Sequence, residues 1–270
     1  MVDIHPDFRP RINQSYPPGN DIIFEEWFFD NFDSSIKTKR EYLPIFFTSF
    51  YVNNRYGKDQ ASMSMMQRMI DNLDRSKKYY TVLQYDDGIM NNISHLDIKV
   101  FGSGGGRIDY PLPLLCQPHA TFENFERTFF ANFMGVMNHP IRKQMKDTLK
   151  MPKYFIRDKE FSIDDYCRIM AQSTFTLCPR GYGLTSFRIV EALQQGSIPV
   201  YISDKFIIPH NKDFQDYGVL IGSNDISRID EILSAITPEE IQRKRELGRL
   251  AYNTIFNWEW NKQMIYKNAD

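Results

Sequence analysis

Apolar runs alternate with stretches of helical spacing along the first half of the chain. Four runs predict buried strands, at residues 43–52, 79–85, 96–101 and 127–133. Between them, residues 62–73 carry apolar side chains at helical spacing, and His139-Pro140 begins a helix that continues to Lys150. Strands that alternate with helices predict a largely parallel sheet.

The second half shows the same alternation more clearly. Ser162 begins a helix to Ala171, and further apolar runs predict strands at residues 175–178, 197–202 and 218–221. Helices are expected at residues 185–195, at residues 225–236 and from Thr237 onward. We therefore expect an α/β fold with two domains, residues 1–150 and 151–270.

The composition limits what the chain can be. Hydrophobic residues make up 42% of it, which excludes a fully disordered chain. Lys and Arg number 33 against 34 Asp and Glu, and a net charge of −1 gives no bulk electrostatic case for nucleic acid or an anionic membrane. Three cysteines without paired spacing predict buried thiols in a reducing compartment. No leader pattern or membrane-length apolar run is present, so we expect a soluble, cytoplasmic protein, although a removed anchor would leave no trace.

The most informative segment runs from Cys178 to Val200. Its pattern predicts a strand, a loop that contains glycines, a helix and a second strand. Gly181 and Gly183 allow the backbone to approach a ligand closely, and Thr185 or Ser186 is expected to cap the helix. The free N–H groups at the start of a helix bind anions. Two arginines can add charge-assisted contacts to a diphosphate, namely Arg180 and Arg188.

Helical geometry separates the side chains of residues 185–195 into two faces. Phe187, Ile189, Val190 and Leu193 face the core, and the opposite face carries Arg188, Glu191 and Gln195. Glu191 then lies one turn into the helix, where a carboxylate can accept both ribose hydroxyls of a nucleotide. The alternative is a solvated ion pair between Arg188 and Glu191 at i,i+3 spacing.

Residues 175–204 closely resemble the donor-binding signature of exostosin-like glycosyltransferases. CPRGYG, TSFR, EAL, G-x-IPV and ISD follow one another in register. Weaker likeness at residues 107–111, 127–135 and 141–142 extends the resemblance over residues 80–255. The compact form looks most like members encoded by large algal viruses, some of which are xylosyltransferases.

The resemblance implies a GT-B architecture, two Rossmann-like domains that face each other across a cleft. The C-terminal domain would bind a nucleotide sugar, usually a UDP-sugar such as UDP-xylose, and the N-terminal domain a glycan or glycoprotein acceptor. The donor-binding residues implied are Arg180, Gly181, Tyr182, Gly183, Thr185, Ser186, Arg188, Glu191 and Asp204, with Arg127 and Arg142 reaching across from the N-terminal half. Such enzymes typically use no metal, and this sequence contains neither HExxH nor Asp-x-Asp. We expect no cofactor besides the UDP-sugar as co-substrate.

An inverting transfer needs a general base, and ligands bind at the carboxyl ends of strands in open α/β sheets. Asp86 and Asp87 directly follow a predicted strand and fit this role best, although they could equally bind sugar hydroxyls or cap a turn. His95 and His119 are the alternatives. The glycine-rich loop at residues 102–106 lacks the GKS/T ending of a phosphate-binding loop and is expected to be a mobile loop at the cleft.

The sequence leaves two other interpretations of the function open. The chain could be a carbohydrate- or nucleotide-binding module that kept the donor fold without turnover. An NAD-dependent enzyme is far less favoured, because GxGxxG after the first strand is missing. Trp258 and Trp260 suit either stacking on a sugar or fixing the last helix to the first domain, and tryptophan more often packs.

Overall fold

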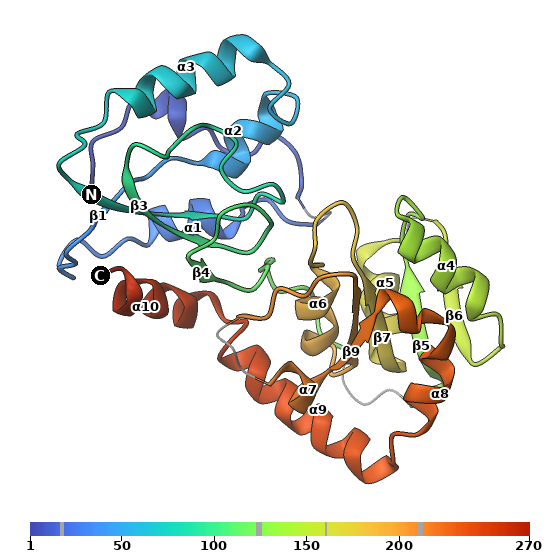
Figure 1. Ribbon diagram of the computed structural model, residues 1–270. Helices are drawn as coiled ribbons and strands as arrows, with labels where there is room; N and C mark the ends of the chain where they lie inside the picture. The colour runs from blue at the N-terminus through green and yellow to red at the C-terminus, as the bar shows by residue number, and fades with distance from the viewer. Residues whose placement is uncertain (17–18, 123–125, 160, 210–212) are drawn as a thin grey trace. The chain divides into compact units, whose positions relative to one another are not determined.

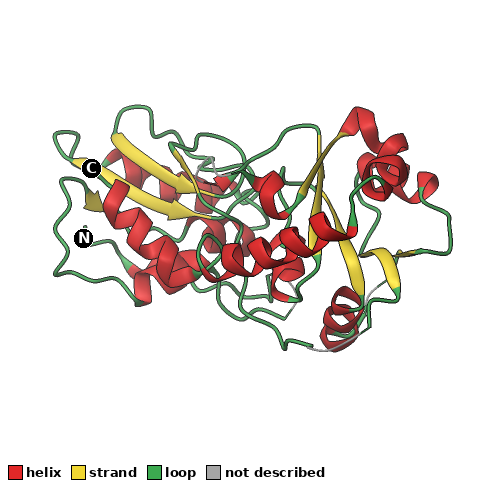
Figure 2. Ribbon diagram, turned by 90° about the horizontal axis from the view of Figure 1, so that it is seen from below, coloured by secondary structure: helices red, strands yellow, loops and turns green. Residues whose placement is uncertain are grey.

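The computed structural model describes residues 1–16, 19–122, 126–159, 161–209 and 213–270. The chain forms two compact units (Figure 1). Unit 1 comprises residues 1–117 together with residues 258–270, and unit 2 comprises residues 118–257. Both units contain a parallel sheet with helices packed on it (Figure 2), which confirms the predicted α/β class.

The sheet of unit 1 has the strand order β1-β2-β3-β4, and all its neighbours are parallel. Its strands are β1 (Glu41–Tyr42), β2 (Lys78–Leu83), β3 (Asp97–Gly102) and β4 (Tyr110–Pro111). Its helices are a 3₁₀ turn at Pro6–Phe8, α1 (Phe24–Asp30), α2 (Phe47–Asn53), α3 (Gln60–Asp71) and α10 (Trp258–Asn268). The chain therefore returns to unit 1 at its end (Figure 1).

Each face of this sheet packs against different helices. Tyr79 and Ile98 share a core with Met66 and Ile70 of α3. On the other face, aromatic side chains of the strands meet α1 and α10 in a chain of ring contacts through Phe28, Tyr42, Tyr80, Phe101 and Tyr266. Trp258 packs edge-on against Phe24 and Trp27, so this tryptophan has a packing role.

The strand predicted at residues 43–52 is wrong. The structure forms only the short β1 before this run and then turns into α2. Every side chain from Phe47 to Val52 is buried, Thr48 and Ser49 included, so burial follows no helical period that distinguishes this run from a buried strand.

The sheet of unit 2 has the strand order β6-β5-β7-β8-β9, and it is parallel throughout. Its strands are β5 (Phe129–Met134), β6 (Tyr154–Arg157), β7 (Ser173–Pro179), β8 (Ile198–Ser203) and β9 (Val219–Gly222). Its helices are α4 (Pro140–Thr148), α5 (Ile163–Ala171), α6 (Arg188–Gln194), α7 (Phe214–Tyr217), a 3₁₀ turn at Ser223–Arg228, α8 (Ile229–Ser234) and α9 (Pro238–Asn253). The strand order reverses between β5 and β7, since β6 lies on one side of β5 and β7 on the other.

Helices cover both faces of this sheet. Phe175, Leu177 and Val200 point into the main core, together with Ile141 of α4 and Ile229 of α8. The alternate side chains of the same strands face α5, α6 and α9. This two-sided covering is typical of doubly wound parallel sheets.

The boundary expected at residue 150 is wrong, because the second unit already begins at Pro118. β5 pairs with both β6 and β7, and α4 packs on the same sheet, so residues 129–148 belong to unit 2. The expected boundary at residue 150 falls between α4 and β6, two elements of the same unit. The long final helix is also interrupted after Asn253, where α9 ends in unit 2 before α10 begins in unit 1. That the two units face each other across a cleft stays a prediction.

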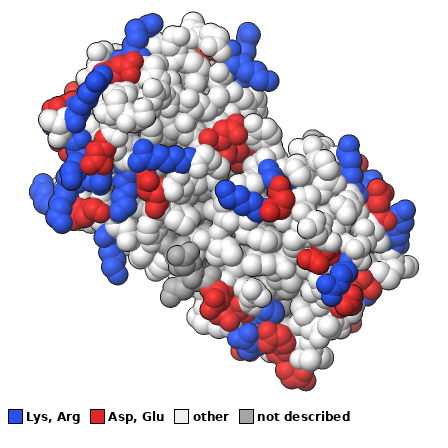
Figure 3. All heavy atoms as spheres, viewed as in Figure 1, with Lys and Arg blue, Asp and Glu red and all other residues white. Residues whose placement is uncertain are grey.

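None of the helices in the described part of the chain is both long and apolar enough to span a membrane. On the face shown in Figure 3, lysine and arginine side chains are interspersed with aspartate and glutamate.

Candidate functional site

The connection between β7 and α6 lies at the carboxyl edge of the unit 2 sheet. The backbone N–H of Arg180 extends the β7–β8 pairing by donating to Ile202 O at 2.9 Å. Later in the same loop, Leu184 O accepts a hydrogen bond from the Tyr201 hydroxyl at 2.9 Å, so a side chain of β8 fixes the loop. The predicted helix start at Thr185 is wrong, since α6 begins only at Arg188, and its N-cap residue Phe187 has no side-chain cap.

Ser186 nevertheless remains part of the helix entry. Its hydroxyl oxygen accepts the backbone N–H of Arg188 at 3.3 Å. The helix starts three residues later than predicted. Leu184 O accepts hydrogen bonds from the hydroxyls of Tyr201 and Ser203 in β8 and therefore does not serve as the first acceptor of the helix. With seven residues, α6 is a short helix, and side-chain charges matter more here than its dipole.

Two arginines converge where β5 and β7 end. Arg188 donates from Nε and Nη2 to Met134 O, at 3.2 and 2.7 Å. Arg142, from α4, donates from Nη1 to Val136 O at 2.9 Å and from Nε to Arg180 O at 3.1 Å. Both guanidinium groups lie over the Phe133 ring, with their carbons 4.7 Å (Arg188) and 5.7 Å (Arg142) from its centre. This is the point of strand-order reversal, where ligands bind in doubly wound sheets.

The positive charge of this pair is not neutralised by a carboxylate. Within the described ranges, no Asp or Glu oxygen comes within 4.0 Å of the Arg142 or Arg188 nitrogens. Burial and, to a smaller extent, the nearby charge of Arg188 lower the pKa of Arg142 to about 10. Arg142 therefore stays charged at neutral pH, and two guanidinium groups side by side attract anions.

Glycines make room for these two side chains. A Cβ at Gly181 would lie 2.8 Å from Arg142 Nη2, and a Cβ at Gly135 would lie 2.2 Å from Arg188 Nη2. Gly135 also has a φ of 145°, which side chains rarely adopt. The predicted role of Gly181 in close approach therefore includes close approach to an arginine of the protein itself.

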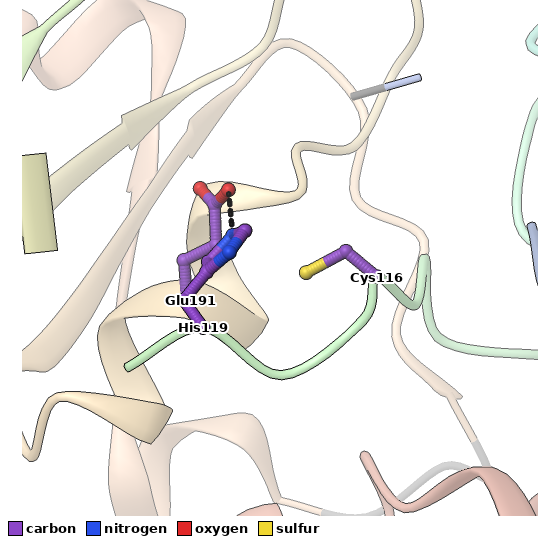
Figure 4. Close-up of side chains that lie close together, drawn as sticks. All are labelled: Cys116, His119 and Glu191. Carbon is purple, nitrogen blue, oxygen red and sulfur yellow. Dashed lines mark hydrogen bonds and ion pairs between the residues drawn. The ribbon is translucent and has the colours of Figure 1, made fainter. Parts of the chain in front are cut away.

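Glu191 is the centre of a buried polar network (Figure 4). Its Oε2 accepts a hydrogen bond from the Tyr166 hydroxyl at 2.7 Å, and its Oε1 lies 3.3 Å from His119 Nε2. The His119 and Glu191 side chains are only 5% and 6% exposed. Burial raises the pKa of Tyr166, which keeps its hydroxyl protonated as a donor. Cys116, also drawn in Figure 4, belongs to unit 1.

The alternative interpretation of Glu191, an ion pair with Arg188, is wrong, since its carboxylate bonds His119 and Tyr166 instead. The segment that supplies His119 is held on α6 by two neighbouring glutamines. Gln194 Oε1 accepts the backbone N–H of His119 at 3.1 Å, and Gln195 Nε2 donates to Ala120 O at 2.9 Å. The polar end of α6 thus fixes the backbone that carries the histidine.

Arg180 and Asp204 come together beside the arginine pair. Arg180 Nη1 donates to Asp204 Oδ1 at 2.5 Å, and Nη2 donates to Tyr182 O at 2.9 Å. The hydrogen bond from Arg180 lowers the pKa of Asp204. Arg180 Nε is buried and has no hydrogen-bond partner in the described part of the chain. The Tyr182 side chain is 70% exposed next to this group.

Arg127 does not join these residues. It precedes β5 and lies at the amino edge of the sheet, where it donates to Ser173 O and, at 2.8 Å, to Gly196 O. Gly196 ends α6, and Arg245 donates to the same carbonyl at 3.2 Å. Two arginines thus cap the carboxyl end of α6, a favourable place for cations. The expected donor contact of Arg127 conflicts with this geometry, because the sequence likeness does not reveal at which end of the strand the residue lies.

Asp86 and Asp87 follow β2 in unit 1, at the carboxyl edge of that sheet, as expected. The glycine-rich loop packs against them, and the Gly105 N–H donates to Asp86 O. A Cβ at Gly104 would lie 2.1 Å from Tyr85 O, and one at Gly106 would lie 2.4 Å from Asp87 O. These glycines permit backbone packing against the aspartate turn, which accounts for them without a phosphate.

The sequence does not predict the two residues that contact the Glu191 carboxylate. Tyr166 lies on α5, a segment whose pattern indicates only an amphipathic helix, and no spacing links it to Glu191. The sequence suggests His119 only as an alternative general base, not as a partner of Glu191. One signal in the sequence does point to this contact. Two polar residues at the end of α6, Gln194 and Gln195, indicate that another segment packs against this end of the helix.

Comparison with known proteins gives a family match over half of the chain. The model of the exostosin GT47 domain matches residues 101–236. The chain is 34% identical over 96 residues to an Exostosin-1 homolog of Caenorhabditis elegans, covering 35% of this chain and 25% of that protein. It is 31% identical over 153 residues to a probable glycosyltransferase of Arabidopsis thaliana, with coverage of 54% and 30%.

A third relative is named as a probable beta-1,4-xylosyltransferase, IRX10L of Arabidopsis thaliana. It is 32% identical over 152 residues, covering 51% of this chain and 36% of that protein. The matches thus span between a quarter and about a third of the length of these relatives.

Proposed function

Since the chain belongs to the exostosin GT47 family, we propose that it is a glycosyltransferase that transfers a sugar from a UDP-sugar to a hydroxyl of a glycan or glycoprotein acceptor. The observation that carries the proposal is the pair formed by buried Arg142 and half-buried Arg188 at the carboxyl ends of β5 and β7. In the described part of the chain no carboxylate neutralises these two charges, and a diphosphate would supply the anion that they attract.

The arginines would hold the diphosphate and stabilise the charge that develops on it as the sugar leaves. Arg142 and Arg188 are fixed by backbone carbonyls, so they are oriented before the donor binds. The unpartnered Nε of Arg180 offers a third donor. In this proposal, guanidinium groups take the role that a metal ion has in metal-dependent transferases.

Glu191 is proposed to bind the ribose. A carboxylate has about four acceptor sites, and the contacts with Tyr166 and His119 use one on each oxygen. Each oxygen retains an acceptor site for a ribose hydroxyl. Gly183, Thr185 and Ser186 belong to the loop that leads to this helix.

The finer assignments rest on the family and its relatives. Xylose is the sugar we propose, supported by the relative named as a probable xylosyltransferase. Asp87, with Asp86 as the alternative, is proposed as the base of an inverting transfer, supported by its position after β2 and its exposure. The resemblance to compact virus-encoded members stays a prediction.

Calorimetric titration with UDP and UDP-xylose, followed by a transfer assay, tests the proposal. We expect UDP binding, slow hydrolysis of the UDP-sugar without acceptor, and transfer with acceptor. Asp87→Asn should reduce transfer while leaving UDP affinity intact, and Asp86→Asn tests the alternative base; full transfer activity in both variants would place the base elsewhere. UDP binding without hydrolysis or transfer for any sugar would instead identify a non-catalytic binding module, and no UDP binding would refute the donor site.

A further inference from the structure

An unusual turn follows α2 in unit 1. Arg55, Tyr56 and Gly57 all have left-handed backbone conformations, with φ values of 57°, 58° and 73°. Glycine adopts this region freely, whereas each non-glycine residue there costs about 1–3 kcal/mol. Two consecutive side chains held in this way form a strained turn, and such strain persists where the surrounding structure enforces it, often at ligand sites.

Contacts from three segments enforce this turn. The Gly57 N–H donates to Tyr51 O at 3.1 Å. Gln14 Nε2 donates to the Tyr56 hydroxyl at 3.0 Å, which fixes the far end of the ring. Met90 lies directly over Gly57, where a Cβ would be 2.7 Å from its Cε. The Tyr56 ring is therefore held at both ends, yet its side chain remains 52% exposed.

The turn lies next to the aspartates that follow β2. Tyr51 stacks edge-on against Tyr85, with ring centres 5.1 Å apart, and its hydroxyl accepts the Met90 N–H at 3.1 Å. The segment from Tyr85 to Met90, which contains Asp86 and Asp87, is thus fixed to the helix that ends in the turn. Met90 is 43% exposed, so an apolar surface continues from Tyr56 toward the aspartates.

The two aspartates lie in the chain between the two side chains that contact this part of unit 1. Tyr85, which packs on Tyr51, directly precedes Asp86, and Met90, which packs on Gly57, follows Asp87 by three residues. An exposed aromatic face, a tyrosine hydroxyl and carboxylates at one sheet edge match a sugar ring, which has an apolar face and a rim of hydroxyls.

We propose that Tyr56, with Met90 beside it, forms a subsite that stacks on a sugar ring of the acceptor glycan, next to Asp86 and Asp87. This proposal rests on the proposed transferase function and adds the residues that bind its acceptor. A neutral glycan fits better than a protein partner, because the surface offered here is small: two exposed apolar side chains, Tyr56 and Met90, with the Tyr56 hydroxyl held by Gln14.

The test compares Tyr56→Ala and Tyr56→Trp with the wild-type protein. Lys58→Ala, an exposed neighbour on the same turn, is the matched control. Binding is measured by titration against a panel of xylose-, galactose-, fucose- and glucose-containing oligosaccharides. UDP affinity, acceptor-free hydrolysis of UDP-xylose, thermal unfolding and sedimentation are measured on each variant.

We expect Tyr56→Ala to weaken binding of every recognised glycan at least tenfold, about 1.4 kcal/mol, and to raise the KM for acceptor. Tyr56→Trp and Lys58→Ala should bind nearly as the wild type does. UDP affinity should stay unchanged in all three, since it reports on unit 2, and acceptor-free hydrolysis should stay unchanged because it uses no acceptor glycan.

Three results would overturn the subsite. One is a wild-type protein that binds UDP but no glycan of the panel. Another is equal glycan affinity of Tyr56→Ala and wild type. The third is a change in sedimentation on Tyr56→Ala without a change in glycan affinity, which would assign the surface to a second copy of the chain. Failure of UDP binding or hydrolysis is a separate result, which refutes the proposed function itself.

Discussion

Replacing Glu191 with alanine perturbs stability and donor binding by separable amounts. The carboxylate is buried and bonded to the Tyr166 hydroxyl and to His119. Alanine leaves both groups without their partner, and each unsatisfied buried polar group costs about 1–3 kcal/mol. We therefore expect the free energy of unfolding to fall by about 2–6 kcal/mol, a large part of the 5–15 kcal/mol typical of a domain.

Glu191→Gln separates the two effects. Glutamine keeps the volume of the side chain and one acceptor oxygen, so one of the two contacts survives and the loss of stability should be about 1–3 kcal/mol. It also removes one ribose acceptor. We expect UDP affinity to fall at least tenfold, about 1.4 kcal/mol, and the preference for UDP over 2′-deoxy-UDP to shrink.

The assays are urea unfolding and calorimetric titration with UDP and 2′-deoxy-UDP. Tyr166→Phe serves as a control, because it removes one hydrogen bond to Glu191 and leaves the carboxylate in place. If Glu191→Gln keeps both UDP affinity and the discrimination against 2′-deoxy-UDP, the ribose assignment is refuted. If Glu191→Ala unfolds at the same urea concentration as wild type, the buried network does not hold.

Three further predictions concern residues around this site. Gly135→Ala should destabilise the protein by about 1–3 kcal/mol, because alanine is strained at the φ of 145°. The new Cβ should also displace Arg188 from Met134 O and so weaken UDP binding, and unchanged UDP affinity in calorimetry would contradict this. Arg127→Gln should lower stability by about 2–3 kcal/mol in urea unfolding while UDP affinity stays within about twofold, since it caps α6 at the opposite edge. Arg180→Ala should raise the pKa of Asp204 toward 3.8 in an NMR titration, because the arginine lowers it. In the wild type, the Arg180–Asp204 pair contributes less than about 1 kcal/mol to the stability of the fold at pH values above the pKa that Asp204 has in the unfolded chain. This contribution is lost as the pH falls through the lower pKa of Asp204 in the folded protein.

The sequence predicted the second unit well, because its strands are short apolar runs bounded by glycine, proline and capping residues. Ser162 and Thr237 cap α5 and α9 as expected. The domain boundary was not predictable in this way. β5 continues the alternation of strand and helix without a linker, and its pairing with β6 and β7 assigns it to unit 2.

The candidate site was predicted in part, for a reason that its geometry explains. Arg180, Arg188 and Glu191 lie within one local segment, so their grouping follows from the chain itself. Tyr166 and Arg142 approach from α5 and α4, and their contacts depend on tertiary packing that no spacing encodes. The resemblance found Arg142 but also suggested Arg127, which lies at the other edge of the sheet.

The central claim is that Arg142 and Arg188 bind the diphosphate of the donor. The most direct test is calorimetric titration of wild type, Arg142→Gln and Arg188→Gln with UDP and with UMP, with Arg127→Gln as a buried-arginine control. We predict that each of the first two variants loses about 10- to 100-fold in UDP affinity, since one charge-assisted hydrogen bond contributes about 1.5–3 kcal/mol, and that UMP loses less. UDP affinity equal to that of wild type in both variants would contradict the account.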